Sequence, residues 1–169
     1  MRRLVINAFV VLVLAGCGGK QAAVTTPTTT AAAPPATTTA APTLTSPSDR
    51  EACAVLQTKI RDVAALVSGS VELMTQSLHP QELAQRTGEA QRNLLLAAGS
   101  LDLMRVPRPL VIARRRLVIG LQSFAADFGR AKSAVVRNDM ATAAGELSDP
   151  RSLSNVSAAT KQINRLCGR

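Results

Sequence analysis

The feature that most constrains this chain is an unbroken apolar stripe with helical spacing between residues 110 and 135. Apolar residues recur there at alternating intervals of three and four, which places them on one face of an α-helix. The stripe consists of Leu110, Ala113, Leu117, Leu121, Phe124, Phe128, Ala131 and Val135. Asn138-Asp139 follows directly and is expected to end the helix. The pattern therefore predicts one long amphipathic helix in the second half of the chain.

Further apolar stripes with helical spacing occur on both sides of this one. A helix is expected from about residue 49 to 78, with Ser48 and Glu51 as a capping box. Shorter stripes cover 83–101, 140–147 and 153–167. Prolines separate the segments, because Pro fits the first turn of a helix and disfavours helix in the residue before it. The predicted fold is all-α, an antiparallel four-helix bundle of up-down-up-down order whose last segment is broken near Asp149-Pro150.

The amino-terminal residues have the layout of a secretory signal. Arg2 and Arg3 supply positive charge, and residues 4–14 form a compact apolar run. This run is too short to span a bilayer as a permanent helix, which takes about 20 apolar residues. Residues 1–16 are therefore expected to be a signal peptide. An ordinary secretory signal with an incidental cysteine, or an uncleaved anchor, are the alternatives.

The motif Leu14-Ala15-Gly16-Cys17 resembles the lipobox of bacterial lipoproteins at every position. The resemblance implies that a diacylglycerol is attached to Cys17, that cleavage occurs before Cys17, and that the new amino terminus is often acylated. Two or more acyl chains, such as palmitate, anchor a protein stably to a membrane. The expected location is the extracytoplasmic side of the cell membrane. The composition, rich in Ala and Arg, also resembles envelope lipoproteins of high-GC actinobacteria.

Residues 17–48 are predicted to be the lipidated cysteine followed by a disordered tether rich in Thr, Pro and Ala. Thr and Pro favour extended backbone at about 3.1 Å per residue, so the tether would reach at most about 100 Å. It is either an inert spacer or a site of O-glycosylation, and the sequence favours neither. Residues 49–169 are predicted to be the helical bundle domain, which has an ordinary single-domain size.

Two further cysteines, Cys53 and Cys167, lie near the start of the first expected helix and the end of the last. In an antiparallel four-helix bundle these two helix ends lie at the same end of the bundle. The expected compartment is oxidising, so a disulfide between them is predicted. A redox or metal role would need a close CxxC pair or neighbouring histidines, and the sequence has neither.

Composition excludes several classes of ligand. The chain has no Trp and no Tyr, so it lacks the aromatic platforms that sugar and single-stranded nucleic-acid sites use, and no nucleic-acid partner is expected. The formal charge is +9, of which Arg2, Arg3 and Lys20 contribute three, leaving +6 on residues 49–169. A basic domain near a membrane is attracted to anionic lipid headgroups or acidic wall polymers.

A run of arginines is the candidate binding site. The possible anion patch comprises Arg105, Arg108, Arg114, Arg115 and Arg116. Guanidinium groups bind phosphate and carboxylate through paired hydrogen bonds, although a solvated helix face explains the same residues. His79, the single histidine, would need an oriented nucleophile to act as a general base, and nothing in the sequence supplies one. No catalytic residues, metal site or cofactor are predicted, and the chain is not expected to be an enzyme.

These observations lead to two functional hypotheses of different classes. The first is a membrane-anchored, non-enzymatic helical module that binds an envelope protein or an acidic wall or lipid component. The alternative is a carrier or sensor that binds an amphiphile or anionic lipid in a crevice of the bundle. A core poor in aromatic rings can be tightly packed or hollow, and the sequence does not decide between these.

Overall fold

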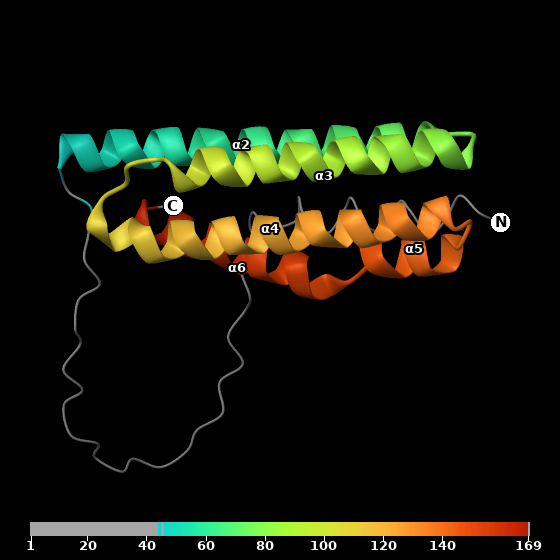
Figure 1. Ribbon diagram of the computed structural model, residues 1–169. Helices are drawn as coiled ribbons and strands as arrows, with labels where there is room; N and C mark the ends of the chain where they lie inside the picture. The colour runs from blue at the N-terminus through green and yellow to red at the C-terminus, as the bar shows by residue number, and fades with distance from the viewer. Residues whose placement is uncertain (1–43, 45, 169) are drawn as a thin grey trace, which may run out of the picture. The chain divides into compact units, whose positions relative to one another are not determined.

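Helices make up nearly all of the chain that the structure describes, which is Leu44 and residues 46–168 of a computed structural model. The helices, shown in Figure 1, are α2 (Pro47–Gln76), α3 (Pro80–Asp102), α4 (Arg108–Val136), α5 (Met140–Leu147) and α6 (Pro150–Leu166). This part of the chain contains no strand, so the all-α prediction is confirmed. The predicted signal peptide, the Cys17 lipidation site and most of the tether lie outside the described residues.

The first helix begins two residues earlier than predicted. The Ser46 hydroxyl accepts a hydrogen bond from the Asp49 amide at 3.1 Å, and Pro47 occupies the first turn. The predicted capping box of Ser48 and Glu51 is therefore wrong. The physical reason is that Pro47 is well suited to the first helical position, where its missing N–H costs nothing. The serine before that proline, rather than the one after it, becomes the cap.

The predicted breaks after α4 and before α6 are confirmed. Asn138 ends α4 with a φ of 60°, a left-handed conformation that asparagine adopts more readily than most residues. Asp139 then caps α5 by accepting a hydrogen bond from the Thr142 amide at 3.0 Å, and hydrogen bonds from Thr142 lower the pKa of Asp139. Asp149 caps α6 in the same way, accepting from the Arg151 amide at 2.9 Å.

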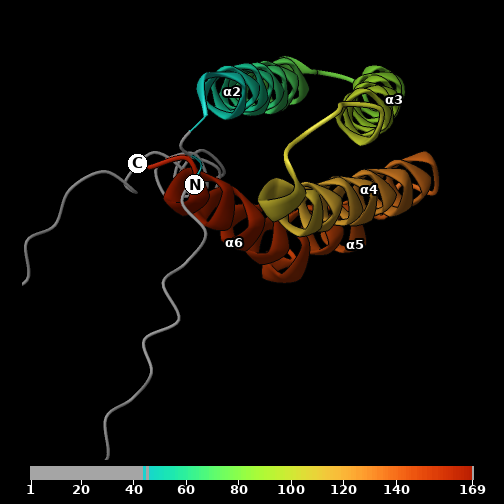
Figure 2. The ribbon, with the colours of Figure 1, turned by 90° about the vertical axis from the view of Figure 1, so that its left-hand side faces the viewer.

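Helix α4 is the centre of the packing. It packs against α3, α5 and α6, whereas α2 packs mainly against α3, as Figure 2 shows in a view close to the helix axes. Every residue of the apolar stripe predicted between residues 110 and 135 is buried, which confirms that stripe as the core face. The rings of Phe124 and Phe128 meet edge to face with their centroids 5.0 Å apart. The two phenylalanines thus fill the middle of a core built otherwise from small and branched side chains.

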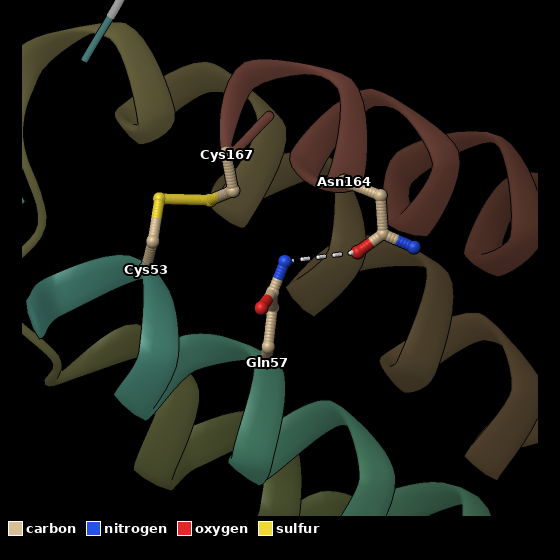
Figure 3. The surroundings of a disulfide bond; sticks show 4 residues. All are labelled: Cys53, Gln57, Asn164 and Cys167. Carbon is tan, nitrogen blue, oxygen red and sulfur yellow. Dashed lines mark hydrogen bonds between the residues drawn. A yellow bond between two sulfur atoms is a disulfide. The ribbon is translucent and has the colours of Figure 1, made fainter. Parts of the chain in front are cut away.

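A disulfide joins Cys53 on α2 to Cys167, directly after α6, as predicted (Figure 3). The Cα atoms of the two cysteines are 5.7 Å apart. One helical turn further along α2, the side-chain Nε2 of Gln57 donates to the side-chain Oδ1 of Asn164 at 3.5 Å. The backbones of α2 and α6 otherwise approach each other at few points, although side chains of both helices belong to one apolar core. The disulfide adds a covalent link between the first and the last described helix.

Candidate functional site

The structure does not place the five arginines of the predicted anion patch on one face: Arg105 is exposed in the connection between α3 and α4, and the other four lie on α4. Arg114 turns inward: its side chain is 17% exposed, and Nη1 donates to the backbone oxygen of Met104. Its Nη2 also lies 3.8 Å from the carboxylate of Asp102 at the end of α3. The Nε atom is buried and has no hydrogen-bond partner among the described residues. Arg114 thus fastens the connection between α3 and α4 and does not belong to an exposed patch.

We expect Arg114→Ala to lower the free energy of unfolding by about 2 kcal/mol, because a part-buried hydrogen bond from a charged donor is lost. The measurement is urea unfolding of the chain from residue 17 to 169 carrying Cys17→Ser, hereafter the unanchored chain. Arg115→Ala is the matched control, since Arg115 is the exposed neighbour on the same helix. Its effect should stay within about 0.5 kcal/mol. Equal effects of the two substitutions would contradict the structural role of Arg114.

Two of the arginines share the outer face of α4 with two isoleucines. Residues 108, 112, 115 and 119 follow each other at intervals of four, three and four, which aligns them on one side of the helix. Ile112 is 63% exposed and Ile119 is 52% exposed. Within the part of the chain that the structure describes, neither Arg108 nor Arg115 has an ion-pair partner. We call Arg108, Ile112, Arg115 and Ile119 the Arg/Ile face.

Sequence reasoning identified the arginines of this face and missed the isoleucines. Both isoleucines lie outside the buried stripe of α4. Their spacing of seven residues, which keeps them on one face of a helix, was visible in the sequence. Isolated exposed apolar residues are normal on protein surfaces. Ile112 and Ile119 differ from such isolated residues because they are aligned with arginines on a helix face that no other helix covers.

An open groove of about 710 Å³ between α4 and α6 adjoins the Arg/Ile face at Ile119. Arg116 and Arg165 both line it, and Arg116 Nη1 donates to the side-chain oxygen of Gln162 at 3.1 Å. The groove also contains Gly120, where an added Cβ would lie 3.0 Å from Cγ2 of Val156 and 3.2 Å from its backbone nitrogen. Glycine at this position therefore permits the close approach of α4 and α6.

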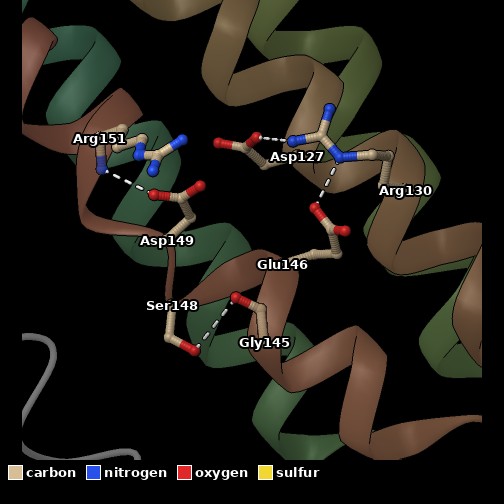
Figure 4. A network of polar contacts seen from close by, with 7 residues as sticks. All are labelled: Asp127, Arg130, Gly145, Glu146, Ser148, Asp149 and Arg151. Carbon is tan, nitrogen blue, oxygen red and sulfur yellow. Dashed lines mark hydrogen bonds and ion pairs between the residues drawn. The ribbon is translucent and has the colours of Figure 1, made fainter.

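A second open groove, of about 690 Å³, lies between α4 and α5 and is also rich in cationic residues. There Arg130 bridges two acids, as Figure 4 shows: it donates to the buried Asp127 carboxylate, and its Nε donates to Glu146 Oε2 at 2.6 Å. The hydrogen bond to Glu146 raises the pKa of Arg130 above its ordinary value. Because the charge of Arg130 is already paired within the protein, this arrangement holds α5 against α4 and leaves Arg130 less available to a ligand.

His79 stands apart from both grooves. It lies at the start of α3, exposed, and its side chain makes no capping hydrogen bond. Among the described residues, no three His, Cys, Asp or Glu side chains are grouped so that they could hold a metal ion. The chemistry-bearing groups that the structure does bring together are the cationic and apolar side chains along α4.

Comparisons with family models, curated proteins and solved structures gave no significant match to this chain. In the described part of the chain, no helix is both long enough and apolar enough to cross a membrane. The function is therefore inferred from the residues and their geometry. The Arg/Ile face and the groove beside it are the candidate binding site.

Proposed function

We propose that this protein is a lipid-anchored envelope protein whose helical domain acts as a non-enzymatic binding module. The signal peptide of residues 1–16 and the lipidation of Cys17 are supported by the resemblance to a lipobox. The disulfide between Cys53 and Cys167 supports an oxidising, extracytoplasmic location, because such bonds are rare in the cytosol of mesophiles. We further propose that α2, α3, α4 and the α5–α6 pair form an up-down-up-down bundle.

The observation that carries the binding role is the open Arg/Ile face on the central helix. The other faces of α4 are covered by α3, α5 and α6, and its apolar stripe is buried among them. The two exposed isoleucines instead alternate with Arg108 and Arg115, which have no ion pair among the described residues. A guanidinium that is not already paired is available for phosphate or carboxylate groups of a ligand.

A carrier role is the second candidate, and the groove between α4 and α6 favours it. Arg116 and Arg165 line this groove together with Ile119 and Leu166. The two arginines could bind the anionic headgroup of an amphiphile, and the two apolar side chains beside them could contact its acyl chain. The groove is open to solvent, so a bound amphiphile would exchange with its surroundings more readily than one enclosed in the core.

The test is mass spectrometry of the mature protein taken from its own envelope in gentle detergent. The denatured, non-reduced sample should have the mass of the chain from Cys17 with a diacylglycerol attached and two hydrogens missing for the disulfide. The unanchored chain, which carries Cys17→Ser, should lack this modification and leave the membrane fraction on washing with concentrated salt, which screens electrostatic binding. Unmodified Cys17 in the mature protein would contradict the anchor.

The native spectrum of the same sample separates the two binding roles. A stoichiometric, non-covalent lipid adduct that disappears in an Arg116→Gln/Arg165→Gln variant would favour the carrier role. A protein free of such an adduct, or one that retains another polypeptide, would favour the interaction module.

A further inference from the structure

We propose that the Arg/Ile face docks the helical domain onto anionic lipid headgroups of the membrane that holds the Cys17 anchor. This inference rests on the proposed function and names the partner of its binding site. The domain would then lie with α4 against the membrane surface, and the tether would serve to place it there. The contact is distinct from the lipid anchor, since it uses residues of the folded domain.

The geometry of the face suits a membrane surface. Its four residues cover 11 intervals of α4, or about 17 Å along the helix at about 1.5 Å per residue. Arginine and isoleucine alternate along this length, so each exposed isoleucine has a cation beside it. Apolar side chains of such a helix enter the boundary between headgroups and acyl chains, while long cationic side chains extend to the phosphates.

The charges that α4 itself contributes around the face are all positive. Between Arg108 and Ala126, α4 contains no acidic residue, and the first carboxylate on this helix is Asp127. Arg116 and Arg165 line the groove that adjoins the face, and the neighbouring Arg114 is already paired with Asp102. Residues 49–169 carry a net charge of +6. A partner of this face must attract the arginines and also accept the apolar isoleucines. An anionic bilayer does both, because its headgroups are negative and its interior is apolar.

The chain itself would bring this face close to the membrane. Figure 1 shows that α2 and α4 begin at the same end of the helices, so the chain enters the domain at the end where the Arg/Ile face starts. Only 26 residues lie between Cys17 and Leu44, the first described residue, so this segment spans about 84 Å at the polyproline rise of about 3.1 Å per residue. A tether of this length holds the domain at a high effective concentration near the lipid surface.

The test uses the absence of tryptophan in the chain, because one introduced indole then reports a single position. Ile119→Trp places the indole on the Arg/Ile face. Val136→Trp is the matched control, since Val136 is 70% exposed at the other end of the same helix. Each lipidated variant is reconstituted into vesicles of phosphatidylcholine alone or mixed with phosphatidylglycerol, and brominated lipids serve as quenchers.

We expect the Ile119→Trp fluorescence to shift to the blue and to be quenched in the anionic vesicles and far less in the neutral ones. The Val136→Trp fluorescence should change little in either. Adding Arg108→Gln and Arg115→Gln to the Ile119→Trp variant should abolish most of the quenching. For the unanchored chain, vesicle partitioning should fall by about fivefold for each arginine removed.

Three patterns of quenching would overturn the proposal, and so would the absence of quenching at position 119 on anionic vesicles. The three patterns are equal quenching in neutral and anionic vesicles, equal quenching of the two tryptophan positions, and quenching that survives the loss of both arginines. A tryptophan at 119 that stays unquenched on anionic vesicles would also exclude the membrane and leave an acidic protein as the occupant. If Cys17 carries no lipid, the protein will not remain on neutral vesicles, so an error in the proposed anchor is recognised separately. The docking is then still tested with the unanchored chain.

Discussion

Replacing both Cys53 and Cys167 by alanine should lower the free energy of unfolding of the unanchored chain by about 4 kcal/mol. The disulfide closes a loop across 114 residues of sequence, which removes many conformations from the unfolded chain. Its loss also removes the covalent link between α2 and the end of α6. The measurement is urea unfolding, and the reduced parent protein should match the double variant.

The same change should loosen one helix more than the others. The middle of α2 is only partly buried at Ile60, Val63 and Val67, whereas the apolar stripe of α4 is fully buried. Amide hydrogen exchange in α2 should therefore accelerate more than exchange in α4 when the disulfide is absent. An unchanged urea midpoint, or equal acceleration in both helices, would contradict this role of the bond.

Arg130→Ala should cost about 2 kcal/mol of unfolding free energy, because it leaves the buried Asp127 carboxylate without its charged hydrogen-bond donor. Asp127 is 3% exposed, and its second carboxylate oxygen is buried with no hydrogen-bond partner among the described residues. Removing Arg130 would leave this carboxylate without the cation that pairs with it. The cost therefore arises at buried Asp127, since the Arg130 side chain is itself half exposed.

A double substitution distinguishes this cause from a general loss of packing. Adding Asp127→Asn to Arg130→Ala removes the unpaired charge, so the double variant should be more stable than Arg130→Ala alone. Arg137→Ala is the matched control, because Arg137 is an exposed arginine directly after α4. Its effect should stay within about 0.5 kcal/mol. Asp127→Asn is also measured alone. If the effects of Asp127→Asn and Arg130→Ala on the unfolding free energy simply add in the double variant, Asp127 and Arg130 are not coupled.

Three consecutive arginines of α4 have three different environments, and only the structure shows which arginine has which. Arg114, Arg115 and Arg116 are consecutive, so about 100° of helix rotation separates each from the next. The first therefore points at the α3–α4 connection, the second at solvent and the third at the groove beside α6. A patch read from sequence proximity alone includes residues that cannot reach one ligand.

The sequence by itself determined the helices, their breaks and the pairing of the two cysteines. Periodicity, proline and capping residues act within a few positions of each other, so local pattern is enough to predict the helices and their breaks. The predicted cap of α2 was wrong because Pro47 moves it to Ser46. The cysteine pairing instead followed from the expected antiparallel order of the helices and an oxidising compartment. The tertiary structure alone decided that α4 is central, that Asp127 is buried beside Arg130, and that Ile112 and Ile119 stay exposed. These properties depend on which helix faces are covered by neighbours. That is set by packing between residues far apart in the chain, which local periodicity does not contain.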